Sequence, residues 1–274
     1  MTSAVGAEVR LVGLVHVYRV LGTDVAALRG VDLDVDPGER VALLGPSGSG
    51  KSTLLSLLAG LRRPSAGSVL VDGENIAAFG ERQLSRYRAR TLGLMLQGVA
   101  STLLPYATPS ECVRFATGAS ASEDPVLVAA GLASERRPVA QLDRAQRQLT
   151  ALAVAMARRP ALLLLDEPTS GLGEDERDAL FDALLTATGR SGTTVVVVTH
   201  DEEVAGRMQR MVRMRDGRIG AEGLRHEQYA VIGADGSIQL PEALAAGWPA
   251  GAQVRVEQVG ETIQIRHRQT GGDR

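Results

Sequence analysis

One short glycine-rich run constrains this chain more than any other part of its sequence. Residues 45–52 fit the pattern G-x-x-x-x-G-K-[ST] and lie between an apolar, strand-sized run at 41–44 and a helix-spaced run at 51–61. Glycines there let backbone N–H groups converge on a phosphate, and the start of a helix adds the positive end of its dipole. The run predicts a phosphate-binding loop with the candidate contacts Gly45, Pro46, Ser47, Gly48, Ser49, Gly50, Lys51, Ser52 and the following Thr53.

The lysine of this loop is the single lysine of the chain, since every other basic side chain among the 30 Lys and Arg is arginine. A lysine ammonium is a compact charge on a flexible stem, which a planar guanidinium does not replace in a tight cradle. We expect Lys51 to neutralise the β- and γ-phosphate oxygens of ATP and the Ser52 hydroxyl to ligate Mg²⁺. A chance glycine loop is the alternative, and the sole lysine at this position argues against it.

Strand-like and helix-like runs alternate from about residue 9 to residue 220. Strands are predicted at 67–71, 92–96, 162–165 and 194–198, and a helix at 146–159 that Pro160 stops. The continuous apolar runs at 162–165 and 194–198 are typical of parallel strands buried on both faces. We therefore predict an α/β fold of the P-loop NTPase type, with a mostly helical insert at 98–141 in which Pro105 and Pro109 are breaks.

Two carboxylates follow the apolar strand at 162–165. Asp166 lies at the carboxyl end of this strand, a position from which it could hold Mg²⁺ through water. The adjacent Glu167 is the candidate general base that polarises the attacking water. The alternative is a solvated pair of strand-end carboxylates, and the phosphate loop elsewhere in the chain favours the catalytic interpretation.

The phosphate loop, Gln97, the segment before Gln146 and the runs LLLLDEPTS and VVVVTHD occur in the order and approximate spacing of ABC ATPases, which the chain resembles from residue 8 to residue 220. The resemblance implies that Tyr18 stacks on adenine, although alone it would be interpreted as strand filler. It also implies that Gln97 touches Mg²⁺ and senses a transmembrane partner, and that His200 contacts the γ-phosphate. The insertion at residues 22–24 resembles the macrolide-exporter and lipoprotein-release branch.

Two motifs that act on the partner's nucleotide in that family are altered. The family's LSGGQ corresponds to Leu142, Asp143, Arg144, Ala145 and Gln146, and its SALD to Ser170, Gly171, Leu172 and Gly173. A carboxylate about 4 Å from a phosphate costs about 4 kcal/mol in a partly buried site. A lost hydrogen bond to a charged oxygen costs a further ~1.5–3 kcal/mol, which Arg144 could partly offset. We predict an asymmetric pair with a second, different ATPase subunit; a homodimer with slow turnover is the alternative.

The character of the sequence changes after residue 220, with short strands predicted at 229–232, 238–240, 253–257 and 262–265 and a one-turn helix at 241–246. This part resembles AbrB/MazE-type swapped-hairpin domains, which implies dimerisation or regulation, with Trp248 as a core anchor. Packing on its own ATPase domain and DNA binding are alternatives, and five arginines against seven carboxylates from residue 222 onward disfavour DNA. The predicted domains are an ABC ATPase domain at 1–221, with a helical subdomain at about 98–158, and a small module at 229–268.

Composition and charge limit which other classes of protein this chain can belong to. A formal net charge of -2 disfavours nucleic-acid binding, and no apolar run approaches the roughly 18–20 residues that span a bilayer. The single cysteine, Cys112, suits a reducing compartment and is interpreted as a small buried side chain. We expect a cytoplasmic ATPase, peripheral at the inner face of the membrane, that drives transmembrane permease subunits. The alternatives are an ATP-dependent regulator that gates a membrane partner and a non-transport ABC ATPase.

Overall fold

The computed structural model describes residues 6–20, 22–98, 103–118, 124–224, 227–230, 254–260 and 262–267. Its largest sheet has the strand order β11-β10-β9-β3-β8-β7-β6, and a second sheet has the order β2-β1-β4-β5. The strands of the large sheet are β3 (Arg40–Leu44), β6 (Leu92–Met95), β7 (Leu162–Asp166), β8 (Thr194–Thr199), β9 (Arg210–Arg215), β10 (Arg218–Leu224) and β11 (Glu227–Ala230). Those of the small sheet are β1 (Val9–Val20), β2 (Thr23–Val35), β4 (Ala66–Val71) and β5 (Glu74–Asn75).

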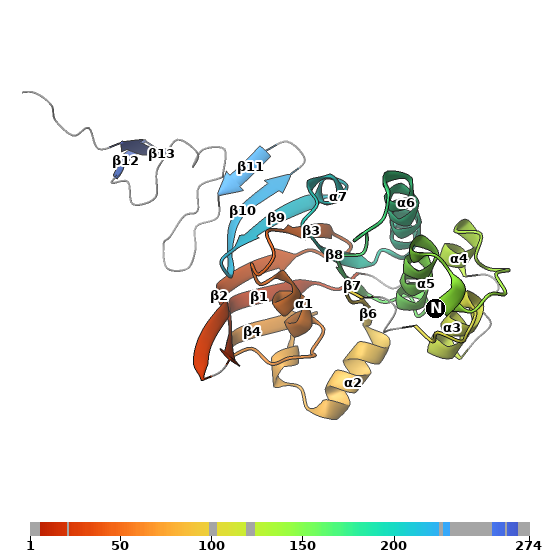
Figure 1. Cartoon of the computed structure of the whole chain (residues 1–274). Helices are drawn as coiled ribbons and strands as arrows, with labels where there is room; N and C mark the ends of the chain where they lie inside the picture. Colours follow the sequence, from red (N-terminus) through yellow and green to blue (C-terminus); the bar gives the residue numbers. More distant parts are fainter. Residues whose placement is uncertain are drawn as a thin grey trace, which may run out of the picture.

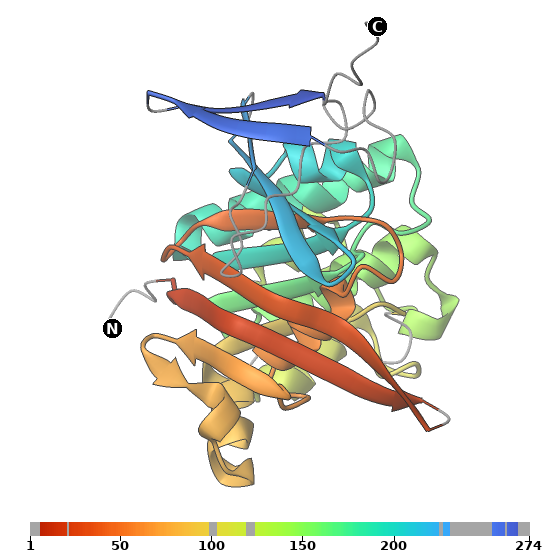
Figure 2. The same ribbon diagram turned by 90° about the vertical axis from the view of Figure 1, so that its left-hand side faces the viewer.

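The helices lie on both faces of the large sheet (Figure 1). They are α1 (Lys51–Leu58), α2 (Glu81–Arg90), α3 (Pro109–Thr117), α4 (Pro125–Ala129), α5 (Arg144–Met156), α6 (Glu174–Ser191) and α7 (Glu202–Gly206). Helix α1 packs between the two sheets, whereas α3, α4, α5 and α6 gather on the other side. Figure 2 shows strands β1 and β2 of the small sheet in front of the central strands of the large sheet.

The central strands of the large sheet are parallel, as predicted from their continuous apolar runs. Neighbouring strands pair in parallel along β9-β3-β8-β7-β6, and β10 and β11 are antiparallel additions. Alternate side chains of β7 and β8 enter two different cores. One core, against α5 and α6, takes Leu163, Leu165, Val195 and Val197, and the other, against α1 and the small sheet, takes Leu162, Leu164, Val196 and Val198. Burial on both faces therefore explains the unbroken apolar runs.

The predicted helix boundaries need correction, and local capping gives the reason. Helix α5 begins at Arg144 rather than at Gln146, because Asp143 Oδ1 accepts a hydrogen bond from the Gln146 N–H at 2.8 Å and caps the helix. Helix α1 ends at Leu58 rather than at residue 61, because Gly60 takes the left-handed backbone conformation (φ 61°). Caps of this kind stop or start a helix without changing its apolar periodicity.

The insert between β6 and β7 is helical, but Pro109 starts a helix there instead of breaking one. Thr108 accepts a hydrogen bond from the Glu111 N–H, and Pro109 occupies the first turn of α3, where its missing N–H costs nothing. Helices α3 and α4 both pack on α5. Cys112 of α3 is buried, with 3% exposed, as predicted, and this burial raises the pKa of its thiol.

The strands near the C-terminus belong to two different sheets. Tyr229 and Ala230, which were predicted to begin the C-terminal module, instead belong to β11 and pair with β10 of the large sheet. The strands β12 (Val254–Val259) and β13 (Thr262–His267) pair with each other as a hairpin. The predicted strand at 238–240, the helix at 241–246 and Trp248 lie outside the described residues. Over the ranges that the structure describes, no helix is long and apolar enough to cross a membrane.

The packing of β6 on α5 can be tested at Gly93. A methyl group on Gly93 would lie 2.5 Å from the Ala155 carbonyl oxygen, so Gly93→Ala is expected to lower the free energy of unfolding by about 1–3 kcal/mol. The control is Gly189→Ala in α6, where an added methyl group meets nothing within 4 Å and should raise stability by about 0.5–1 kcal/mol. Urea unfolding measures both values. A Gly93→Ala protein as stable as the wild type would contradict this packing.

Candidate nucleotide site

The phosphate loop runs from the end of β3 into α1, and two of its glycines have no substitute there. A methyl group on Gly45 would lie 2.2 Å from the Met214 carbonyl oxygen of β9. Gly50 has φ 101°, and a methyl group on it would lie 2.5 Å from the Ala27 carbonyl oxygen of β2. The loop is therefore compressed between two neighbouring strands, and only glycine fits at these two positions.

Lys51, the first residue of α1, is 6% exposed and reaches back over the loop. Its ammonium donates hydrogen bonds to the carbonyl oxygens of Gly45 (2.7 Å) and Pro46 (2.9 Å). Burial lowers the pKa of Lys51, and the carboxylates of Glu167 and Asp166 act in the opposite direction. The loop thus holds a cation within it, at the position where the motif predicts a phosphate contact.

Ser52 and Asp166 meet at the base of the loop although they are far apart in the sequence. The Ser52 hydroxyl donates to Asp166 Oδ1 over 3.2 Å. Burial raises the pKa of the Asp166 carboxyl, with a further rise from Glu167, while the hydrogen bond from Ser52 and the charge of Lys51 lower it. A hydroxyl and a carboxylate side by side are the oxygen ligands that Mg²⁺ accepts together with phosphates and water.

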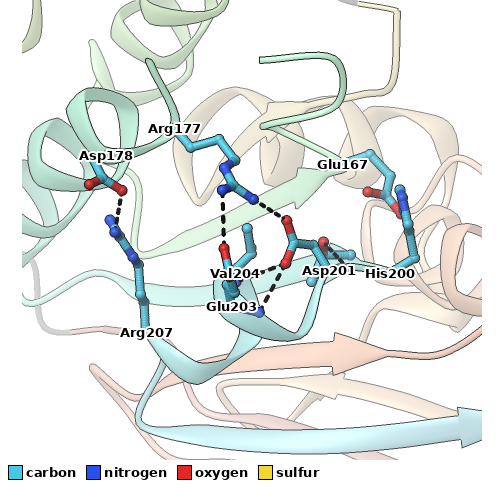
Figure 3. Close-up of polar contacts among 9 residues, drawn as sticks. Glu167, Arg177, Asp178, His200, Asp201, Glu203, Val204 and Arg207 are labelled. Carbon is cyan, nitrogen blue, oxygen red and sulfur yellow. Dashed lines mark hydrogen bonds and ion pairs between the residues drawn. The ribbon is translucent and has the colours of Figure 1, made fainter. Parts of the chain in front are cut away.

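Glu167 follows the end of β7 in the left-handed backbone conformation, with φ 50°. Such a conformation costs a residue with a side chain about 1–3 kcal/mol, and it recurs at functional sites. The Glu167 carboxylate lies 2.9 Å from His200 Nδ1 at the end of β8 and is 12% exposed. Figure 3 shows these two side chains facing each other. The arrangement brings a largely buried carboxylate and an exposed imidazole to the same edge of the sheet.

These groups open onto one pocket of about 450 Å³. It is lined by ten of the residues predicted from sequence, namely Tyr18, Ser47, Gly48, Gly50, Lys51, Ser52, Thr53, Gln97, Glu167 and His200. Ala27 also lines it, and no sequence pattern marked that residue. Gly45, Pro46, Ser49 and Asp166 do not line it, although Gly45 and Pro46 accept hydrogen bonds from Lys51 and Asp166 accepts one from Ser52. The volume lies within the range of about 300–1,000 Å³ that is usual for small-molecule sites.

Tyr18 is fixed at the rim of this pocket. Its hydroxyl lies 3.2 Å from the Thr53 hydroxyl. The guanidinium carbon of Arg62 lies 5.1 Å from the ring centroid, and the His16 ring meets the Tyr18 ring edge-to-face at 4.6 Å. The ring is therefore held by contacts on several sides, which suits a platform for an aromatic base.

The segment at 142–146, which was predicted to bind nucleotide, does not line this pocket. Asp143 caps α5, and Arg144, Ala145 and Gln146 form the first turn of that helix. The Arg144 guanidinium lies against Gly171, since a methyl group on Gly171 would sit 2.2 Å from an Arg144 nitrogen. The segments at 142–146 and 170–173 therefore contact each other.

A glycine loop at the end of a parallel strand, a helix that begins at its lysine, and an aspartate at the end of a second parallel strand define a P-loop nucleotide-binding ATPase domain. Comparison with known proteins narrows this class. The family model described as ABC transporter matches residues 28–170, and the chain belongs to this family as an ATP-binding ATPase subunit.

Individual proteins that are similar to this chain agree with this membership. A protein named lipoprotein-releasing system ATP-binding protein LolD 2, from Caulobacter vibrioides, is 39% identical over 216 residues, which cover 76% of this chain and 94% of that protein. The LolD protein of Anaeromyxobacter dehalogenans is 42% identical over 206 residues, 72% of this chain and 85% of that protein. The solved dimeric cassette MJ0796 superposes with a TM-score of 0.72 at 29% identity, over 80% of this chain and 99% of that chain. A second structure of MJ0796, described as a post-hydrolysis state bound to ADP and Pi, gives a TM-score of 0.71 at the same identity and coverage.

The contribution of the loop lysine to ATP binding can be measured directly. Lys51→Ala is expected to weaken ATP affinity by about 10- to 100-fold, because one or two charge-assisted hydrogen bonds to phosphate are lost. Lys51→Arg is the matched variant, since it keeps the charge but not the compact ammonium, and an intermediate affinity is expected. Isothermal titration calorimetry checks both values. Unchanged nucleotide uptake by Lys51→Ala would contradict the assignment of this site.

Proposed function

We propose that the chain powers a lipoprotein-release-like or macrolide-exporter-like transporter, bound at the cytoplasmic face of the membrane to separate permease subunits. The observation that carries this proposal is the assembled pocket, in which Lys51, the Ser52–Asp166 pair and the Glu167–His200 pair converge. The relatives from Caulobacter and Anaeromyxobacter are named ATP-binding proteins of lipoprotein-releasing systems, which supports the lipoprotein-release branch. The formal net charge of -2 supports a protein partner over nucleic acid.

The pocket supports a division of labour among its side chains. Ser52, Asp166 and Gln97 would hold Mg²⁺, which when bound would neutralise charge on the phosphate oxygens. Lys51 and the loop amides would position the β- and γ-phosphates, and Tyr18 would stack on adenine. Glu167 would orient and polarise the water that attacks the γ-phosphorus. His200, which contacts Glu167 through Nδ1, would hold that carboxylate in place and present its other face to the γ-phosphate.

We further propose that hydrolysis in the working dimer is asymmetric. Every residue assigned to the chain's own nucleotide is retained, whereas the segments at 142–146 and 170–173 are altered. Asp143 would bring a negative charge towards the partner's ATP, although one of its oxygens is engaged in capping α5. Arg144 would offset part of that repulsion. The same alteration supports a second candidate, an ATP-dependent regulator that gates a membrane partner, because slow turnover suits a switch.

Turnover by the isolated chain separates these possibilities. Under the asymmetric proposal, the chain alone hydrolyses ATP slowly and without cooperativity, because no intact signature faces its nucleotide. Glu167→Gln is expected to reduce even this rate by at least about 100-fold while ATP still binds, since only the general base is lost. The control is Glu174→Gln, an exposed carboxylate in the first turn of α6. Brisk, cooperative hydrolysis by the chain alone that Glu167→Gln abolishes would overturn the asymmetric version.

For the C-terminal residues we propose an AbrB/MazE-like dimerisation role. Paired positions place Val254, Val256, Ile263 and Ile265 on one face of the β12–β13 hairpin. Within the described part of the chain, Val256 and Ile263 are 59% and 63% exposed. An isolated two-stranded hairpin is marginally stable in water, so an apolar face of this kind favours association with a second copy.

A truncation tests the dimerisation proposal without cutting the large sheet. Because β11 ends at Ala230, removal of residues 231–274 leaves the sheet intact. The shortened chain is expected to be a monomer in nucleotide-free light scattering, whereas the full chain is a dimer. ATP affinity measured by calorimetry serves as the control for folding and should not change. A shortened chain that still dimerises without nucleotide would exclude this role.

A further inference from the structure

An arginine at the start of α6 connects this helix to the segment that carries His200. Arg177 Nη1 donates to Asp201 Oδ2 at 2.7 Å, and Nη2 donates to Glu203 Oε2 at 3.0 Å (Figure 3). The Arg177 side chain is 22% exposed and that of Asp201 is 27% exposed, so both are largely shielded from solvent. Ion pairs in such positions are screened less than fully exposed ones.

Asp201 is the residue directly after His200, and both of its carboxylate oxygens are engaged. Oδ1 accepts hydrogen bonds from the N–H groups of Glu203 (2.9 Å) and Val204 (3.4 Å) and caps α7, while Oδ2 takes the Arg177 guanidinium. Its own N–H donates to the Thr199 hydroxyl at 3.0 Å. Burial alone would raise the pKa of Asp201, but the N–H of Glu203 and the guanidinium of Arg177 outweigh it and hold the pKa below its usual range. Asp201 therefore stays ionised, and the turn that contains His200 is held on its C-terminal side.

The N-terminal end of α6, which carries Arg177, is joined to Glu167 by a short stretch of chain. Helix α6 follows the short segment at 170–173 that separates it from Glu167, and the Arg177 N–H donates to the Gly173 carbonyl oxygen at 2.9 Å. Glu167 in turn lies 2.9 Å from His200 Nδ1. Two polar contacts therefore join the segment 167–177 to the segment 200–203. One is the Glu167–His200 contact, and the other is the Arg177–Asp201 ion pair.

We propose that Arg177 is a positioning residue: by holding Asp201 against α6, it holds His200 against Glu167 and ties both to the segment at 170–173. The inference rests on the roles proposed for Glu167 and His200. Its consequence is that a displacement of α6, or of residues 170–173 before it, would change the position of His200 through Arg177 and Asp201. A side chain without contact to nucleotide would then affect the chemical step more than binding.

The same pair of segments offers a matched control. Arg207, after the end of α7, forms an ion pair with Asp178 of α6 and lies over the Phe181 ring at 5.6 Å. Figure 3 shows this pair beside the Arg177 pair but away from His200. Removing Arg207 breaks one ion pair between α6 and the α7 segment, and removing Arg177 breaks two, of which the pair with Glu203 is highly exposed on the carboxylate side. Only removal of Arg177 releases the residue adjacent to His200.

The experiment compares ATP turnover of Arg177→Met, Asp201→Asn and Arg207→Met with wild type, using the full chain together with the membrane proteins that co-purify with it. Asp201→Asn keeps an efficient helix cap but removes the charge that Arg177 holds. We expect kcat to fall about 10- to 100-fold in Arg177→Met and Asp201→Asn, as for a small misplacement of a reacting group, with KM changed less than about 2-fold. Arg177→Lys should recover part of kcat, and Arg207→Met should stay within about 2-fold of wild type in both constants.

His200→Ala separates failure of this inference from failure of the assigned chemistry. If His200→Ala lowers kcat but Arg177→Met does not, Arg177 has no positioning role. If His200→Ala itself leaves kcat unchanged, the role proposed for His200 is wrong and the inference falls with it. An equal fall in kcat in Arg177→Met and Arg207→Met would also overturn the proposal, because it would indicate general destabilisation of α7, which thermal unfolding of each variant identifies. A change in KM alone would overturn it as well, because it would indicate an effect on binding.

Discussion

Burial of the central strands on both faces is the constraint from which the site follows. Side chains of β7 and β8 alternate between two cores, and Val195, Val196, Val197 and Val198 are each 0% exposed. Each such side chain stabilises the fold by about 1.5–3 kcal/mol relative to an exposed one. Parallel strands covered in this way end at the same edge of the sheet. The phosphate loop, Asp166 and His200 all emerge there because β3, β7 and β8 stop together.

Charge, and not only shape, organises that edge. The cation of Lys51 lies close to the carboxylates of Asp166 and Glu167, and burial alone would disfavour the charges of Lys51 and Asp166. Glu167 also carries the backbone strain of a left-handed residue. Short contacts, such as Ser52 to Asp166 and Glu167 to His200, hold these groups in their energetically unfavourable positions. A buried cation of this kind favours a polyanionic ligand, which agrees with the membership of the chain in an ATP-binding family.

The start of α5 and the segment at 170–173 are packed against each other. Arg144 and Gly171 fit together in size, because the guanidinium occupies the space that a methyl group on residue 171 would need. Gln148, four residues further along α5, also donates to the Ser170 carbonyl oxygen at 3.4 Å. Two side chains of α5, Arg144 and Gln148, therefore contact the segment at 170–173.

The sequence by itself determined the phosphate loop and the parallel, doubly buried strands, because these depend on local spacing and on continuous runs of apolar side chains. Tyr18, Gln97 and His200, which also line the pocket, were predicted from the resemblance to ABC ATPases. Sequence patterns placed helix ends wrongly at Asp143, Pro109 and Gly60, where a single cap decides the boundary. Only the tertiary structure decided that Glu167 meets His200, that Arg177 meets Asp201, that Ala27 lines the pocket and that β11 joins the large sheet. The physical reason is that polar contacts between residues distant in sequence leave no periodic pattern along the chain, and they form only after the packed core has brought their strands and helices together.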